Sequence, residues 1–142
     1  MTRAQLSQEH IREFVLAGHA IFTAQNTLTG GRFTFKIMKA EANEKFPGDA
    51  WFVSVLAGPD NTADYQYLGM IRDGRFRRTA KSRISEDAPS CKAFAFIWQY
   101  LDRLPAALAI FHEGRCGCCG RALTVPESVT RGIGPVCMEK GL

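Results

Sequence analysis

Residues 19–38, HAIFTAQNTLTGGRFTFKIM, decide the first part of the fold. Both ends of this stretch are rich in β-branched and aromatic residues, which favour strands. The NTLTGG at 26–31 between them has the composition of a turn, so the stretch predicts a β-hairpin. In its second half, Phe33, Phe35 and Ile37 alternate with polar residues, which indicates one buried and one solvated face.

Further strands are expected beyond this hairpin. Residues 50–56, AWFVSVL, predict a third, more buried strand. Residues 65–71 and 75–79 flank Asp73-Gly74, the residue pair that type I′ turns favour, and predict a second hairpin. Together these segments give a small antiparallel sheet of about five strands.

Two helices are expected outside these strands. Residues 8–17 follow Ser7, a suitable N-cap, and carry one apolar face. Residues 90–101 are apolar almost all round, which is typical of a central, largely buried helix. Residues 104–111 are compatible with a short strand that leads into the C-terminal segment.

The composition is that of an ordinary globular protein. The chain has 142 residues, of which 46% are hydrophobic and 23% are charged. No apolar run approaches the roughly 18 to 20 residues that a membrane span needs. The first ten residues, MTRAQLSQEH, contain no apolar stretch of the kind that secretory signals have. We therefore expect a cytoplasmic protein, in a bacterial host if the chain is phage-encoded, with no membrane partner.

Charge is concentrated in one place. Between residues 72 and 83 lie six cations and one acid, a local charge of +5 in a chain whose total is +4. Such a band is typical of proteins that bind an anionic partner, most often nucleic acid, although a solvated hairpin has the same composition. The candidate nucleic-acid contacts are Arg72, Arg75, Arg77, Arg78, Lys81 and Arg83. Tyr65, Tyr67 and Phe76 lie among or beside them and would suit stacked bases, or would belong to the core.

Four of the five cysteines lie near the C-terminus. Cys116 and Cys119 form a C-x-x-C pair followed by glycine, and Cys137 comes 18 residues later. This spacing suits a zinc knuckle, in which two thiolates reach one ion about 2.3 Å away. The odd number of cysteines and the absence of a secretory signal argue against a disulfide framework.

Three thiolates leave one corner of a tetrahedral site to be filled. His112, four residues before Cys116, is the first choice for the fourth ligand. Cys118 is the second choice and Cys91 a distant third, while a water molecule would make the site open to catalysis. The predicted metal set is therefore His112, Cys116, Cys119 and Cys137, holding a structural zinc ion.

These observations define the expected fold class. We predict an α+β protein in which a small antiparallel sheet of about five strands carries one packed central helix. A zinc-knuckle or treble-clef-like finger follows at the C-terminus. The expected domains are residues 1–111, the α+β domain, and residues 112–142, the finger packed on it.

The pattern C-x-x-C-G-R-x-L-T-x-P-x-S-x(4)-G-I-G-P-x-C, from Cys116 to Cys137, resembles the C-terminal zinc-finger motif of an uncharacterised family met mainly in phages and mobile DNA. The front half of the chain resembles, more loosely, phage proteins in which this finger follows a small α/β domain. The resemblance implies zinc and a phage context. It implies no reaction.

Three classes of function follow from these patterns. The first is a zinc-stabilised accessory protein that binds nucleic acid, with DNA and RNA both open, through the basic hairpin and the finger. The alternative is a protein-binding inhibitor of a host defence complex, similar to an anti-CRISPR protein. An enzyme is not expected, because the chain has no nucleophile elbow, no H-E-x-x-H and no phosphate loop.

Overall fold

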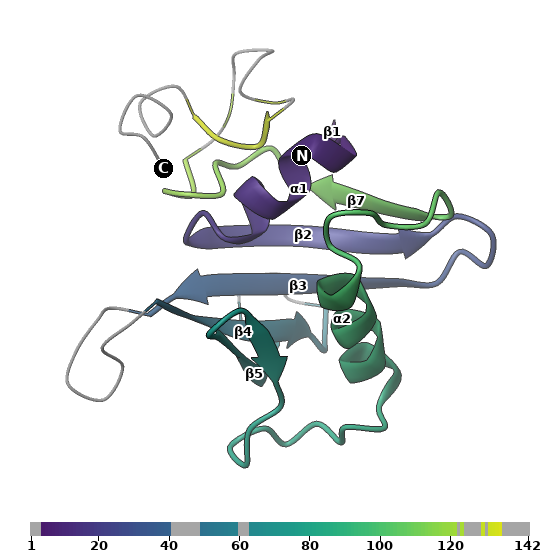
Figure 1. Cartoon of the computed structure of the whole chain (residues 1–142), viewed down its shortest axis with the longest axis vertical. Helices are drawn as coiled ribbons and strands as arrows, with labels where there is room; N and C mark the ends of the chain where they lie inside the picture. Colours follow the sequence, from purple (N-terminus) through teal and green to yellow (C-terminus); the bar gives the residue numbers. More distant parts are fainter. Residues whose placement is uncertain are drawn as a thin grey trace.

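The computed structural model of the chain describes residues 4–40, 49–59, 63–121, 123, 129 and 131–134. The described part consists of one antiparallel sheet and two helices (Figure 1). In chain order the elements are β1 (Ala4–Gln5), α1 (Gln8–Val15), β2 (His19–Asn26), β3 (Arg32–Lys39), β4 (Ala50–Leu56), β5 (Tyr65–Arg72), β6 (Arg75–Arg77), α2 (Pro89–Gln99) and β7 (Leu108–His112). Neither helix has the length and apolar character that crossing a membrane would require.

The sheet has seven strands in the order β1-β7-β2-β3-β4-β5-β6. Strands β2 to β6 follow the chain, whereas β7 returns from the far end of the sequence to pair with β2. The pairing runs from Phe22 opposite His112 to Asn26 opposite Leu108. This return places the C-terminal segment beside the N-terminal half of the sheet.

Both predicted hairpins are confirmed, and local chemistry explains each turn. In the β2–β3 turn, the side-chain oxygen of Asn26 accepts hydrogen bonds from the backbone N–H groups of Leu28 and Thr29. In the β5–β6 turn, Asp73 and Gly74 have φ angles of +54° and +73°, the left-handed pair that a type I′ turn requires. These turns fix the pairing of the strands on either side of them.

The expected fold class is wrong, because the protein is mostly β. The sheet has seven strands rather than about five. Its two short helices lie where helices were expected, but neither is the central, largely buried helix that was predicted. Helix α2 is not buried all round: Phe96 and its neighbour Tyr100 are 41% and 44% exposed. Only one side of α2 enters the core, and α1 contributes a buried side of comparable size.

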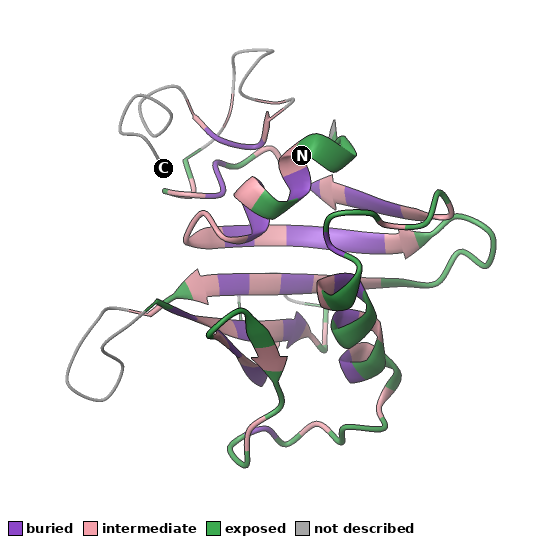
Figure 2. Cartoon of the chain, viewed as in Figure 1, coloured by how far each residue is buried: buried purple, intermediate pink, exposed green. Residues whose placement is uncertain are grey.

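Both helices cover the same face of the sheet. Phe94 of α2 packs against Phe35, with ring centroids 5.1 Å apart, and Phe14 of α1 packs against His112 at 5.7 Å. Phe35 and His112 both pair with Phe22 across the sheet, so they belong to one row of side chains on one face. Figure 2 shows the burial that results along β2 and β3.

The packing of α2 leads to the first prediction. Phe94 is fully buried between Phe35 and Phe76, while Phe96 on the same helix is exposed. Phe94→Ala should lower the free energy of unfolding by about 3–5 kcal/mol, the usual cost of emptying a buried phenylalanine site. Phe96→Ala should lower it by less than about 1 kcal/mol. Urea denaturation of both variants measures the difference, and equal losses would contradict one-sided packing.

Candidate functional site

The first C-x-x-C cysteine lies in a tight backbone turn directly after β7. The side chain of Cys116 is 1% exposed, and its sulfur accepts N–H groups from Gly134 at 3.1 Å and from Cys118 at 3.4 Å. The turn is closed by a hydrogen bond from the N–H of Gly120 to the carbonyl oxygen of Cys116 at 2.9 Å. Gly120 has a φ of +78°, a conformation that favours glycine.

These contacts stabilise a thiolate at Cys116. Burial opposes ionisation, but hydrogen bonds from the backbone N–H groups of Gly134, Cys119 and Cys118 and from the Cys119 side chain outweigh it. The net effect lowers the pKa of Cys116. Cys119 is exposed, and Cys118 is half-buried. A thiolate held by several backbone N–H groups is the kind of donor that zinc prefers.

The remaining predicted ligands are less well placed or lie outside the described residues. Cys137 lies outside them, and within the described part no group of three or more His, Cys, Asp or Glu side chains could hold a metal. Cys91 lies on the buried side of α2 and belongs to the main core. Of the four predicted ligands, the structure therefore places Cys116 and Cys119 in one turn and gives His112 contacts of a different kind.

His112 is used by the backbone around it. It is fully buried in β7; its Nε2 lies 2.6 Å from the carbonyl oxygen of Val129, and its Nδ1 accepts the N–H of Gly114 at 2.9 Å. The proton therefore sits on Nε2, and both nitrogens are occupied. Burial lowers the pKa of His112, with the Val129 hydrogen bond acting in the opposite direction, so the ring is neutral. These contacts argue against His112 as a zinc ligand and assign it to joining β7 to the chain near residue 129.

The cysteine turn is fixed to α1 by close packing. Gly117 and Gly132 both lie against the ring of Phe14, and a Cβ atom on Gly132 would come within 2.4 Å of that ring. The N–H of Gly117 donates to the carbonyl oxygen of Gly132 at 2.7 Å. Arg131 forms an ion pair with Glu13 of α1 at 3.2 Å. Phe14 therefore holds the cysteine turn, at Gly117, and the backbone at Gly132 against α1 and the sheet.

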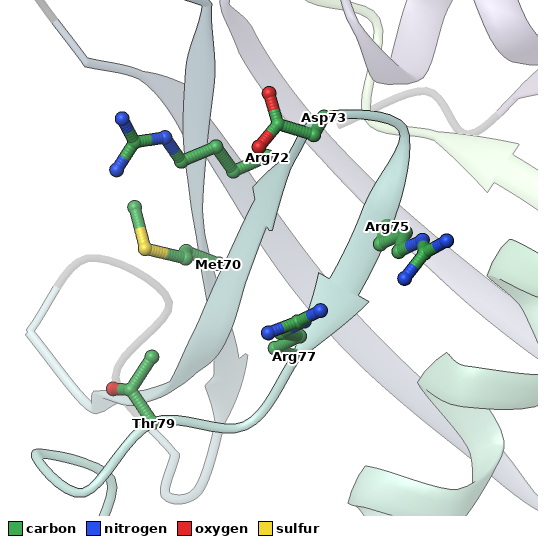
Figure 3. Close-up of a pocket in the computed structure, with 6 residues that line it drawn as sticks. All are labelled: Met70, Arg72, Asp73, Arg75, Arg77 and Thr79. Atoms are coloured by element: carbon green, nitrogen blue, oxygen red, sulfur yellow. The ribbon is translucent and has the colours of Figure 1, made fainter.

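The basic hairpin forms a second candidate site at the opposite edge of the sheet. Met70 pairs with Arg77, and Arg72 pairs with Arg75, so all four side chains belong to one face of β5 and β6. With Asp73 and Thr79 they line an open hollow of about 500 Å³ (Figure 3). Three of its six lining residues are arginines, which makes it a suitable receptor for an anion.

The six predicted cations have different roles. Arg75 and Arg77 are exposed at the hollow, and Arg72 is half-buried beside them. Lys81 and Arg83 are exposed and line a second hollow of about 240 Å³ with Gln66 and Tyr67. The guanidinium group of Arg78, in contrast, donates to the carbonyl oxygens of Ile84 and Ser82, the latter at 3.0 Å. Arg78 therefore shapes the loop that carries Lys81 and Arg83.

The aromatic residues near the cations lie on different faces of the sheet. Phe76 faces the core, with its ring centroid 4.7 Å from that of Phe94, so it cannot stack on a base. Tyr67 faces the other way and meets Phe52 edge to face at 6.2 Å. The sequence patterns did not single out Phe52. The alternation of AWFVSVL, with Val53 in the core, was the signal that could have placed it on the open face.

Comparison with known families gives a match to the C-terminal part of the chain. A family of unknown function (DUF6011) matches residues 106–140. The matched segment contains β7 together with the cysteine turn, so it includes a strand of the main sheet. No curated protein and no solved structure matches the chain.

The packing of the cysteine turn on α1 leads to a second prediction. Gly132 and Gly30 have similar φ angles, +75° and +80°, but only Gly132 has a neighbour where a Cβ would lie. Gly30→Ala should cost about 1–2 kcal/mol through backbone strain alone. Gly132→Ala should cost about 1–3 kcal/mol more, because the added methyl group meets Phe14.

Denaturant unfolding of the two variants isolates this contact. Since the backbone strain is similar at both positions, the difference between them reports the packing of residue 132 on Phe14. If both variants lost the same free energy of unfolding, the close approach of this segment to α1 would be refuted.

Proposed function

We propose that this protein is a zinc-stabilised accessory protein of phage type that binds nucleic acid through the β5–β6 hairpin and is not an enzyme. The observation that carries the proposal is the exposure of Arg75 and Arg77 beside Arg72 in one hollow. Arginine often binds phosphate groups in a bidentate manner. The hollow is open and wide, as an extended polyanion requires.

The charge distribution supports this proposal. The hairpin and the following loop carry a charge of +5, which leaves the rest of the chain near neutral. An anionic ligand would therefore be attracted to this edge of the sheet and to no comparable concentration of charge elsewhere in the sequence. Such attraction supplies most of the affinity in non-specific nucleic-acid binding and weakens with salt.

The proposed zinc ion would be held by Cys116, Cys119 and Cys137. The residues described fit this role, because the buried Cys116 sulfur accepts several N–H groups, as metal-bound thiolates do. His112 is occupied on both nitrogens, so Cys118 or a water molecule remains for the fourth position. Bound zinc would link the cysteine turn to the C-terminal segment and stabilise a part of the chain whose described residues form only a very small core of their own.

The zinc proposal leads to a third prediction. Cys119→Ala should lose bound zinc and lower the thermal midpoint, because one thiolate ligand disappears. Cys91→Ala removes a cysteine from the main core and should keep its zinc. The zinc content of each variant after gel filtration, measured by mass spectrometry, separates the two. Full zinc occupancy in Cys119→Ala would exclude the proposed site.

A separate experiment, in which Co²⁺ replaces zinc, identifies the fourth ligand. Each thiolate bound to Co²⁺ adds sulfur-to-metal charge-transfer absorption. Cys118→Ser should lower this absorption if Cys118 completes the site and should leave it unchanged if water does. His112→Gln should leave it unchanged in both cases.

The nucleic-acid proposal leads to a fourth prediction. Replacing Arg75 and Arg77 together with alanine should weaken binding about tenfold at 50 mM salt and reduce the salt dependence by about 0.7 to 0.9 in log–log slope for each phosphate that is no longer neutralised. Fluorescence anisotropy with labelled oligonucleotides at several salt concentrations measures both quantities. Arg78 is unsuitable for this test, since its replacement would also release the loop at 79–85.

A matched control removes the same charge elsewhere. Lys92 and Arg103 are exposed and lie in and just after α2, on the helix-covered side of the sheet. The Lys92→Ala, Arg103→Ala double variant should bind as the parent does. If the two double variants lost affinity equally, binding would depend on net charge alone and the hairpin would not be the binding surface.

Binding of a protein partner is the second candidate function. It is favoured by an apolar hollow of about 360 Å³ between α2 and the β2–β3 hairpin, lined in part by Phe33, Phe96 and Leu108. Phe96, Tyr100 and Leu28 are the large hydrophobic side chains exposed in the described part. A host defence complex is the partner class proposed. The parent protein should bind such a complex, and the Phe96→Ala, Tyr100→Ala variant should not.

A further inference from the structure

One face of the sheet is free of the two helices and carries the cations of the hairpin. Strand pairing sets two rows of side chains across this face. The first row is Met38, Phe52, Met70 and Arg77, and the second is Lys36, Ser54 and Tyr67. Both rows face away from the core residues that alternate with them, such as Ile37 and Val53. Aromatic, thioether and cationic groups therefore share one surface.

Tyr67 is held in a fixed position on this surface. Its hydroxyl oxygen accepts a hydrogen bond from the hydroxyl group of Thr79 at 3.0 Å, and its ring contacts Phe52 edge to face. Its carbonyl oxygen accepts the hydroxyl group of Ser82 at 3.1 Å, and Ser82 is buried. The ring therefore needs little further ordering when a ligand binds.

The loop beside Tyr67 is also held in place. Arg78 donates to two carbonyl oxygens of this loop, and the Ser82 hydroxyl group ties it to β5. These contacts fix the backbone on either side of Lys81 and next to Arg83 while both cationic side chains stay exposed. Lys81 and Arg83 line the smaller hollow together with Tyr67 and Gln66.

The two hollows are neighbours. Thr79 lines the larger one, and its hydrogen bond to Tyr67 joins it to the smaller one. The surface therefore runs from Arg75 and Arg77, past the Thr79–Tyr67 pair, to Lys81 and Arg83. It offers cations at both ends and an aromatic ring with an adjacent amide, that of Gln66, between them.

This arrangement suits unpaired bases better than a duplex. Aromatic rings in a cationic groove stack on bases whose faces are free, as in single strands. In a duplex both faces of each base are covered by its neighbours, so a ring on the protein has nothing to stack on. An amide such as that of Gln66 can bind the edge of a splayed base, which is also accessible only in a single strand.

We propose that the surface from Arg75 and Arg77 through Tyr67 to Lys81 and Arg83 binds single-stranded nucleic acid, with an unstacked base on the ring of Tyr67. The proposal rests on the nucleic-acid function proposed above and names its substrate class. The cations at the two ends contact phosphates. Tyr67 supplies stacking, and its hydrogen bond to Thr79 keeps the ring in the orientation that a base needs.

The test compares three labelled probes of one sequence, each about 12 nucleotides long and so within the range that single-strand binding sites cover. They are single-stranded DNA, single-stranded RNA and duplex DNA, measured by fluorescence anisotropy with the zinc-loaded full chain. Either single strand should bind at least about tenfold more tightly than the duplex at equal salt. The stronger of the two single strands identifies the preferred sugar.

Variants of Tyr67 test the stacking role. Tyr67→Leu should weaken single-strand binding roughly ten- to hundredfold, the usual effect of removing one stacked base, without changing the salt slope. Tyr67→Phe keeps the ring and should retain most of the binding. Duplex binding should be the same in all three proteins. A change in salt slope with Tyr67→Leu would indicate a disturbed backbone contact rather than the removal of stacking.

A second variant does not depend on the fold tolerating changes at Tyr67. Lys81 and Arg83 are exposed, so replacing both with alanine leaves the core intact. The double variant should weaken single-strand binding and lower the salt slope by about 0.7 for each phosphate that is no longer neutralised. Unchanged binding would overturn the assignment of the smaller hollow.

The outcomes separate the two proposals. Equal binding of single strands and duplex, together with no effect of Tyr67→Leu, would overturn the single-strand inference and leave the nucleic-acid function standing. Absence of binding to all three probes at about 50 mM salt would overturn both. Single-strand preference that Tyr67→Leu removes and Tyr67→Phe retains would establish the stacking site.

Discussion

The pairing of β7 with β2 is the constraint on which the rest of the structure depends. It joins residues 108–112 to residues 22–26 and thereby closes almost the whole chain into one sheet. His112 ends β7 and packs against Phe14 of α1, so the cysteine turn begins beside this helix. Without this pairing, Phe14 would have no partner in the C-terminal segment, and the turn around Cys116 would have no core to pack on.

Phe14 of α1 connects β7 to the cysteine turn that follows it. Its ring contacts His112 on one side and approaches the backbone of Gly117 and Gly132 on the other. Side chains at either glycine would collide with the ring, so both positions require glycine for space. Gly132 also requires it for its backbone conformation, with a φ of +75°. The family match spans β7 and the turn together, and the contacts of Phe14 give a physical reason why the two form one unit.

The sequence predicts the local part of this structure well and the non-local part poorly. The hairpins follow from alternation and turn residues, because both signals lie within about 20 residues of each other. The partner of β7 does not, since the strand at 108–112 has no local feature that selects β2. Helix α2 is misjudged for a related reason. Its apolar residues surround the axis, and only the sheet decides that Phe94 is inside and Phe96 outside.

At the candidate sites, too, the sequence predicts local features and misses non-local ones. The spacing of Cys116 and Cys119 predicts a tight turn, and the turn is present, because it depends on neighbouring residues. The role of His112 is decided by Val129 and Gly114, whose backbone groups occupy both ring nitrogens, and spacing along the chain carries no such information. Six cations in one band look equivalent in the sequence. In the structure Arg78 binds carbonyl oxygens while Arg75 and Arg77 face solvent, so charge density alone cannot tell which cations are exposed to a ligand.

The two candidate sites occupy different ends of the sheet order, which bears on how they can depend on each other. The cysteine turn packs on α1 beside β7 and β2, whereas the cationic surface belongs to β5, β6 and the loop at 79–85. Strands β3 and β4 lie between them. Tyr67 is held by Thr79, Ser82 and Phe52, and none of these contacts involves the cysteine turn. A metal ion at the turn would therefore stabilise the chain as a whole without shaping the cationic surface, and variants at either end can separate the two sites.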